Sequence, residues 1–412
     1  MQRTILHVDA NNFYASVECL YRPELRDKPV VVCGDPELRH GIVLSKNYPA
    51  KAYGIATAET LGAARRKCPD LVPVVADFSK YQRFTEEMRD IFRHYTDCIE
   101  PYGSDEAFLD VSASTGVRGD GKAIADDIRN RVRRQLGITC SAGVADNKPF
   151  AKLGSDMKKP DATTVLAPQD YPTRVWPLPA GDLLFVGRAT QHKLYQLGLL
   201  TIGDVASTSR VVLRTLFGKN GDTLWAYANG KDTSPVVPME TEVPILSVGN
   251  STTTPVDLLD EGDVLRTLCV LVESVAYRLR KHHLQGRVVH VRAVDTDLVG
   301  HGRQGTLTHS TQLSDTILTT ALGLFRASYP WTKPVRNVGV TVSGLSSADG
   351  EQQLSFLPEA ANEERSLRLE RAKDDIRNRF GHLSIQRACL LEPKPLSDLQ
   401  NNHLMFPTSR TS

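Results

Sequence analysis

The segment CIEPYGSDEAFLDVS, at residues 98–112, places two adjacent acids directly after a tight turn between two short β-rich runs. Glycine and serine at 103–104 are turn residues, so the pattern predicts a hairpin. Successive side chains of its second strand would point to opposite faces of the sheet. Asp105 and Glu106 would then lie at the beginning of that second strand. The segment therefore predicts a sheet that presents a pair of carboxylates beside its turn.

The patterns around this hairpin complete the order strand, helix, hairpin, helix, strand. A strand that ends at Asp9 comes first, and the other periodic segments are residues 82–95, 122–136 and 138–145. This order is typical of the split βαβ or ferredoxin-like unit, here with an insertion at roughly 11–74. Asp9 and the Asp105–Glu106 pair would consequently lie on neighbouring strands of one sheet.

Three acids that converge on one sheet call for a cation. Several carboxylates cannot all stay ionised in a poorly hydrated site without a positive charge between them. Oxygen ligands select Mg²⁺ or Mn²⁺ over zinc, and two such ions about 3.5–4 Å apart serve in-line phosphoryl transfer. For Asp9, Asp105 or Glu106 taken alone, a solvated turn residue or a helix cap is the alternative.

The remaining chain divides by its patterns. Residues 180–230 read as short helices punctuated by glycine, and 231–243 carry two prolines without helical periodicity, which is typical of a linker. A second β-α-β-β-α-β set occupies 244–343. A charged helix at 363–380 precedes a polar tail.

The composition is that of an ordinary globular protein. The 412 residues suggest two to four domains, and no apolar run approaches the roughly 20 residues of a membrane helix. The amino terminus lacks the pattern of a signal peptide, so we expect a cytoplasmic protein without a membrane segment. The seven scattered cysteines lack zinc spacing and are interpreted as reduced thiols. A net charge of +2 argues neither for nor against DNA binding.

Four motifs resemble those of the Y-family DNA polymerases, in the bacterial DinB or polymerase IV branch. They are ILHVDANNFYASVE (5–18), NYPAKAYGI (47–55), EPYGSDEAFLDVS (100–112) and GVADNKPFAKLGSDMKKP (143–160), and the likeness covers nearly the whole chain. It implies an α+β, right-hand polymerase with a ferredoxin-like palm, small fingers, a helix–hairpin–helix thumb and a second ferredoxin-like little finger. The implied boundaries are palm 1–10 and 75–165, fingers 11–74, thumb 166–230, linker 231–243, little finger 244–358, and C-terminal helix and tail 359–412.

The resemblance implies a template-directed DNA polymerase that adds a deoxynucleoside monophosphate to a primer 3′-hydroxyl. Its catalytic residues would be Asp9, Asp105 and Glu106, which would hold two Mg²⁺ ions, or Mn²⁺, with help from the backbone carbonyl of Ala10. The implied role is low-fidelity synthesis across damaged templates without proofreading. A non-catalytic relative and a nucleotide cyclase built on the same type of palm are the rival readings.

Further residues match the nucleotide-binding positions of the family. Phe13 and Tyr14 follow the first acid at the family spacing, and Tyr14 matches the steric gate that excludes a 2′-hydroxyl; ordinary helix packing is the alternative for Phe13. Tyr48, Lys51 and Lys159 match the positions that bind the triphosphate. A solvated surface position is the alternative for Lys51 and Lys159. Most relatives carry Arg at the position of Lys51, and the family usually has Ser at the position of Gly103.

The DNA contacts implied by the resemblance are less specific. Gly187 and Arg188 belong to the thumb hairpin, where backbone N–H groups can hold phosphates. Arg287, Arg292 and Arg336 of the little finger would contact the DNA backbone. Simple helix packing and a solvated charged face are the respective alternatives.

A short peptide near the end of the little finger resembles the one by which bacterial polymerases dock on the sliding clamp. It consists of Gln353, Leu354, Ser355, Phe356 and Leu357, and it ends Phe-Leu where family versions end Leu-Phe. An ordinary apolar strand end is the alternative. The implied partners are thus primer–template DNA, a deoxynucleoside triphosphate and the clamp, and we expect a monomer.

Overall fold

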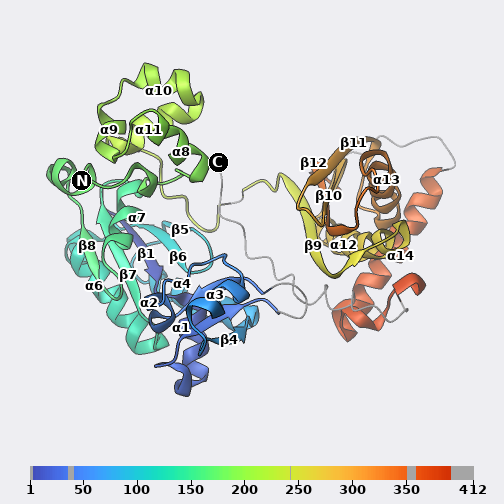
Figure 1. The fold of residues 1–412 in the computed structure, drawn as a ribbon, viewed down its shortest axis with the longest axis horizontal. Coiled ribbons are helices and arrows are strands. Elements are labelled where there is room, and N and C mark those ends of the chain that lie inside the picture. The colour runs from blue at the N-terminus through green and yellow to red at the C-terminus, as the bar shows by residue number, and fades with distance from the viewer. Residues whose placement is uncertain (1–2, 36–40, 242, 350–358, 391–412) are drawn as a thin grey trace. The chain divides into compact units, whose positions relative to one another are not determined.

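The computed structural model describes residues 3–35, 41–241, 243–349 and 359–390, and Figure 1 shows the fold. The described chain divides into two compact units. The first contains residues 3–34 and 42–241, and the second contains residues 243–349 and 359–390. No helix among the described residues is long and apolar enough to cross a bilayer.

A five-stranded sheet forms the centre of the first unit, in the order β5-β6-β1-β7-β8. Strand β1 pairs antiparallel with both β6 and β7, and β8 extends the sheet parallel to β7. The strands are β1 (Ile5–Ala10), β5 (Ile99–Pro101), β6 (Glu106–Asp110), β7 (Cys140–Ala145) and β8 (Thr163–Val165). The predicted ferredoxin-like core is confirmed, with β8 as an additional edge strand.

The two faces of this sheet are covered differently because β1 alternates its side chains. Leu6 and Val8 pack with α4 (Phe78–Arg93) and α6 (Gly121–Arg131), whereas Ile5 belongs to a second core with α7 (Lys148–Met157) and the helical residues 188–228. The helix predicted at 122–136 runs as α6 to Arg131 and continues as a π-helical turn, Val132–Leu136, which ends at Gly137 in the left-handed conformation. A further helix here is α5 (Thr115–Arg118).

A smaller sheet in the order β3-β2-β4 belongs to the insertion after β1. Its strands are β2 (Val30–Cys33), β3 (Val43–Lys46) and β4 (Val72–Val75), accompanied by helices α1 (Phe13–Tyr21), α2 (Tyr48–Ala52) and α3 (Leu61–Lys67). Helix α1 lies between the sheets, because its apolar side chains join the palm core while its length runs beside β2 and β3.

Four short helices follow the palm: α8 (Arg188–Gln196), α9 (Ile202–Ser207), α10 (Arg210–Phe217) and α11 (Lys219–Ala228). Their apolar residues share one core with Phe150 and Tyr171. The segment predicted as a linker, 231–243, begins as part of this packing. Val236 is buried, and the backbone N–H of Val237 donates to the Glu100 carboxylate at 2.8 Å.

The second unit has a four-stranded antiparallel sheet in the order β11-β10-β12-β9. Two helices pack on one face of this sheet, as Figure 1 shows, which confirms the predicted second ferredoxin-like unit. The elements are β9 (Ser247–Leu258), α12 (Glu261–Lys281), β10 (Leu284–Asp295), β11 (Gly300–Thr311), α13 (Ser314–Ser328), β12 (Val335–Ser347) and α14 (Glu359–Phe380).

Buried ion pairs attach α14 and the following turns to α12. Glu273 of α12 accepts from Arg377 at 2.7 Å and from Arg387 at 2.8 Å. The Glu273 side chain is 3% exposed and that of Arg377 is 7% exposed. Since removal of Glu273 would leave the Arg377 charge buried without this carboxylate, Glu273 is a sensitive point of the unit.

We expect Glu273→Ala to destabilise the second unit by about 3–5 kcal/mol, the range for breaking a buried pair. Thermal unfolding and urea titration of the full chain measure this loss. Glu261 is the matched control, because it pairs with Arg326 at the surface of the same unit. Glu261→Ala should cost only about 0–1 kcal/mol. Equal losses for the two variants would contradict the assignment.

Candidate active site

Strand register places two of the three predicted acids opposite one another, and the third precedes one of them in the chain. Asp9 and Glu106 are directly opposite one another in the antiparallel pair of β1 and β6. The backbone N–H of Ala10 donates to the carbonyl of Asp105 at 3.0 Å, which fixes the turn against the end of β1. Acids about a hundred residues apart in the chain thus become neighbours through a few backbone hydrogen bonds.

Two lysines neutralise two of these acids. The Lys159 ammonium lies 2.6 Å from Asp9 Oδ2, and the Lys152 ammonium lies 2.6 Å from Glu106 Oε2. Asp156 of α7 also contacts both lysines, at 2.9 Å and 3.8 Å. The spacing of 152, 156 and 159 places these side chains toward one side of α7 and the turn that follows it.

Close packing of α7 on the sheet places these lysines. A Cβ on Gly143 of β7 would lie 1.9 Å from the carbonyl oxygen of Ala151, so only glycine permits this approach. His7, fully buried on the same strand face as Asp9, lies 3.1 Å from Glu106 Oε2 through Nε2. Its Nδ1 lies 2.8 Å from Ser155 Oγ.

The three carboxylates have different electrostatic environments. Burial and the charges of Glu106 and Asp9 raise the pKa of Asp105 to about 7. Burial and the charge of Glu106 also raise the pKa of Asp9. For Glu106, burial favours the neutral acid, but His7 and Lys152 outweigh it and lower the pKa to about 2. Asp105 is therefore the acid of the three whose ionised form is least favoured without a further cation.

The donor set fits hard divalent cations in kind, since it consists of carboxylate oxygens, and the raised pKa of Asp105 indicates that its charge is poorly compensated. Over the described ranges, no three His, Cys, Asp or Glu side chains are gathered closely enough to hold a metal ion. The ammonium groups of Lys152 and Lys159 instead occupy the positions beside Glu106 and Asp9. A divalent ion bound here would compete with them for the same oxygens.

The aromatic candidates Phe13 and Tyr14 differ in their surroundings. The Tyr14 ring stacks on Tyr81 with 4.1 Å between centroids, and its hydroxyl lies 3.3 Å from Ser104 Oγ, next to Asp105. Tyr14 is half-buried, whereas Phe13 is 3% exposed and packs in the palm core. Packing accounts for the position of Phe13, and a direct role of Phe13 in nucleotide binding stays a prediction.

Tyr48 and Lys51 lie on the short helix α2. The Asn47 side chain caps this helix by accepting from the N–H of Ala50 at 3.1 Å. Burial raises the pKa of Tyr48, and Lys159 and Asp9 act on its hydroxyl, which places it near the acidic site. Lys51 is exposed, with its ammonium 5.7 Å from the centre of the Tyr48 ring.

The predicted DNA contacts are distributed over both units. Gly187 caps the N-terminus of α8, and both it and Arg188 are exposed. Arg287 and Arg292 are exposed on β10, and Arg336 is partly buried on β12. These positions leave a role in phosphate binding as a prediction.

The predicted clamp-binding peptide, 353–357, lies outside the described residues, as does the tail after 390.

Several polar residues of the site were not predicted from the sequence. His7 was passed over although its two-residue spacing from Asp9 places both on one strand face. Lys152 was not singled out within its motif, although its spacing from Lys159 is that of one helix face. Ser155 gave no separate signal.

Family models and curated relatives match most of the chain. Residues 8–156 match the impB/mucB/samB family, residues 246–356 match its C-terminal domain, and residues 181–232 match the thumb domain of DNA polymerase iota. A DNA polymerase IV of Acetivibrio thermocellus is 48% identical over 96% of this chain and 100% of its own length. A DNA polymerase IV of Pelotomaculum thermopropionicum is 38% identical, over 95% of this chain and 96% of its own length.

A solved Y-family DNA polymerase chimera, Dbh-Dpo4(243-245)-Dbh, has the same fold, with a TM-score of 0.73 and 24% identity over 83% of this chain and 98% of its own. The chain belongs to the Y-family DNA polymerases, within the group of its DNA polymerase IV relatives. The fold class and the family expected from the motifs are thereby confirmed. Membership of this family implies dependence on a divalent metal ion.

Proposed function

We propose that this chain is a DNA-directed DNA polymerase that extends a primer on a template, including a damaged one, with low fidelity and without proofreading. The observation that carries the proposal is the register of Asp9 against Glu106, with Asp105 held beside them by the Ala10 N–H. Relatives that match nearly all of the chain are DNA polymerases IV.

In this proposal Asp9, Asp105, Glu106 and the carbonyl of Ala10 hold two Mg²⁺ ions, or Mn²⁺. Such ions would lower the pKa of the primer 3′-hydroxyl and offset charge on the leaving pyrophosphate. His7 and Lys152 keep Glu106 ionised and fix its carboxylate. Asp105, with a pKa raised to about 7, is the acid whose charge most needs a cation beside it.

The proposal also assigns residues to the incoming nucleotide. Lys159, Lys51 and the Tyr48 hydroxyl supply positive charge and a donor for the triphosphate. Ion pairs with Asp9 and Asp156 outweigh the effect of burial and raise the pKa of Lys159, so it stays charged. The Tyr14 ring would lie beneath the sugar. Lysine at position 51 gives a point charge rather than the planar fork of arginine.

A primer-extension assay with Mg²⁺ tests the proposal against its rivals. Template-dependent extension of the primer supports it. Clamp binding without extension would support a non-catalytic relative, and a cyclic nucleotide made without template would support a cyclase. The cyclase is disfavoured because it needs neither the helical thumb nor the second ferredoxin-like unit.

The proposed DNA contacts are Gly187 and Arg188 in the thumb and Arg287, Arg292 and Arg336 in the little finger. They would bind phosphates without reading sequence, which suits an enzyme that copies any template. We also propose that the protein acts as a monomer in the cytoplasm.

We further propose that residues 353–357 dock on the sliding clamp. Tethering to the ring would raise the local concentration of the enzyme at the primer end. Deletion of 353–357 should reduce clamp-stimulated extension by roughly tenfold or more and leave extension without the clamp unchanged. Primer extension with and without the clamp measures this. Unchanged stimulation would contradict the assignment.

A further inference from the structure

The loop that carries Lys159 is fixed by contacts to the residue two positions later. The backbone N–H of Asp161 donates to Asn11 Oδ1 at 2.9 Å, and the Asp161 carboxylate accepts from Arg129 and Arg133, both at 2.8 Å. Arg129 also donates to the Asp161 carbonyl oxygen. Asp161 has a φ of +50°, a backbone conformation that needs such support in a residue other than glycine.

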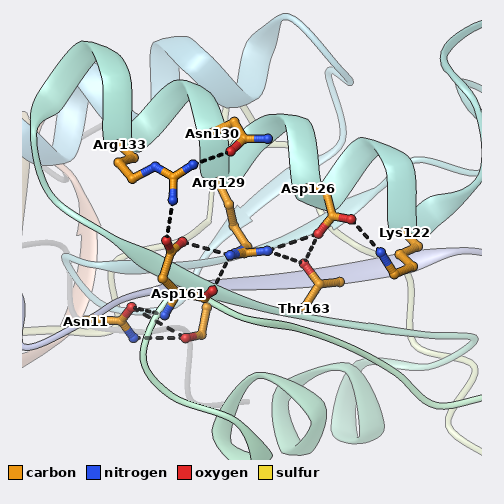
Figure 2. A network of polar contacts seen from close by, with 9 residues as sticks. Asn11, Lys122, Asp126, Arg129, Asn130, Arg133, Asp161 and Thr163 are labelled. Carbon is orange, nitrogen blue, oxygen red and sulfur yellow. Dashed lines mark hydrogen bonds and ion pairs between the residues drawn. The ribbon is translucent and has the colours of Figure 1, made fainter.

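Arg129 is the centre of this network, as Figure 2 shows. Its guanidinium lies between Asp161 on one side and Asp126 and Thr163 on the other, with contacts of 3.0 Å to Asp126 and 3.1 Å to Thr163. The side chain is 15% exposed, and it projects from α6, whose Ile128 is buried in the palm core. The network therefore connects the loop to a rigid part of the sheet unit.

The other end of the network reaches the acidic site. Asn11, which receives the Asp161 N–H, is two residues after Asp9, is 2% exposed, and donates to Ser141 Oγ on β7 at 3.0 Å. Lys159, two residues before Asp161, contacts Asp9 at 2.6 Å. Both ends of the Lys159–Asp9 contact are thus held by the same set of hydrogen bonds.

We propose that Arg129, through Asp161, is a positioning residue that holds Lys159 where the nucleotide triphosphate binds. This inference rests on the proposed function of Lys159. Arg129 does not reach the acidic cluster and acts only by fixing the loop. An ammonium group on a loose loop would bind the triphosphate less well, because binding would have to order the loop.

A double-mutant cycle on the full-length enzyme tests the inference. We expect Arg129→Ala to raise the KM for the nucleotide about tenfold, which is less than the roughly hundredfold that a 1 Å misplacement can cost, while the DNA Kd is unchanged. Lys159→Ala should raise this KM at least as much. In the double variant, Arg129→Ala should add little, because the group on which it acts is gone. Arg129→Lys should restore part of the loss, since it retains one charged donor.

Arg134→Ala is the matched control, since Arg134 is exposed in the turn that follows α6. Its KM should equal that of the unmodified enzyme. If Arg129→Ala does not fold, judged by thermal unfolding, Asp161→Ala replaces it in the cycle with the same expectation. Additive effects in the double variant would overturn the inference but leave Lys159 assigned. An unchanged KM in Lys159→Ala would overturn the inference together with that assignment.

Discussion

Glu106→Gln should reduce the rate of primer extension by roughly a thousandfold or more, because the loss of one metal-binding carboxylate removes several kcal/mol of transition-state stabilisation. Glutamine has the shape of glutamate and retains an oxygen for Lys152, so the fold should survive. DNA binding should be nearly unchanged, since this side chain faces the acidic cluster. Single-turnover extension and a DNA-binding titration measure the two quantities.

Asp110→Asn is the matched control for this variant. Asp110 is at the other end of β6, where its carboxylate accepts from the N–H of Ser112 at 3.0 Å. Asparagine retains that acceptor, so extension should stay close to normal. Substantial extension by Glu106→Gln would refute the metal assignment, and an equal loss in Asp110→Asn would show that the strand, not the site, is responsible.

Tyr14→Ala should let ribonucleotides into the site. The expected result is a fall of about a hundredfold in the preference for deoxyribonucleotides, the size of discrimination a pocket gains against one added hydroxyl group. The preference is measured as the ratio of kcat/KM for the two sugars. This ratio is independent of the active fraction, so a loss of stability from removing the stack on Tyr81 does not affect it.

Tyr14→Phe separates the ring from its hydroxyl. The ring would remain stacked on Tyr81, and only the 3.3 Å contact with Ser104 Oγ would be lost. Sugar discrimination should therefore be retained. A large loss in Tyr14→Phe would mean that the hydroxyl rather than the ring selects the sugar, and an unchanged ratio in Tyr14→Ala would exclude the gate.

The sequence predicts the parts of this fold that depend on local pattern. The turn before Asp105 and the alternation after it predict β5 and β6, and the apolar stripe of α4 predicts its buried face. The strand order also predicts that Asp9 lies close to the acid pair. The central site can therefore be predicted from the sequence alone.

Features that depend on long-range packing could not be predicted from local sequence patterns. Nothing local to Lys152 indicates that it pairs with Glu106, because the contact depends on the close approach of α7 at Gly143. Strand β8 is only three residues long and gives almost no periodic signal. The π-helical form of the last turn, Val132–Leu136, was not predicted either, because its apolar residues keep a nearly helical spacing.

The two ammonium groups beside Asp9 and Glu106 have a consequence for the stability of the protein without divalent ions. They are counter-ions for two of the three acids, so they reduce the repulsion between the carboxylates when no divalent ion is bound. Removal of divalent ions should then inactivate the enzyme without unfolding it. In the proposed metal site, added divalent ions would displace the lysine ammonium groups from the carboxylates. Activity would then return without refolding of the palm.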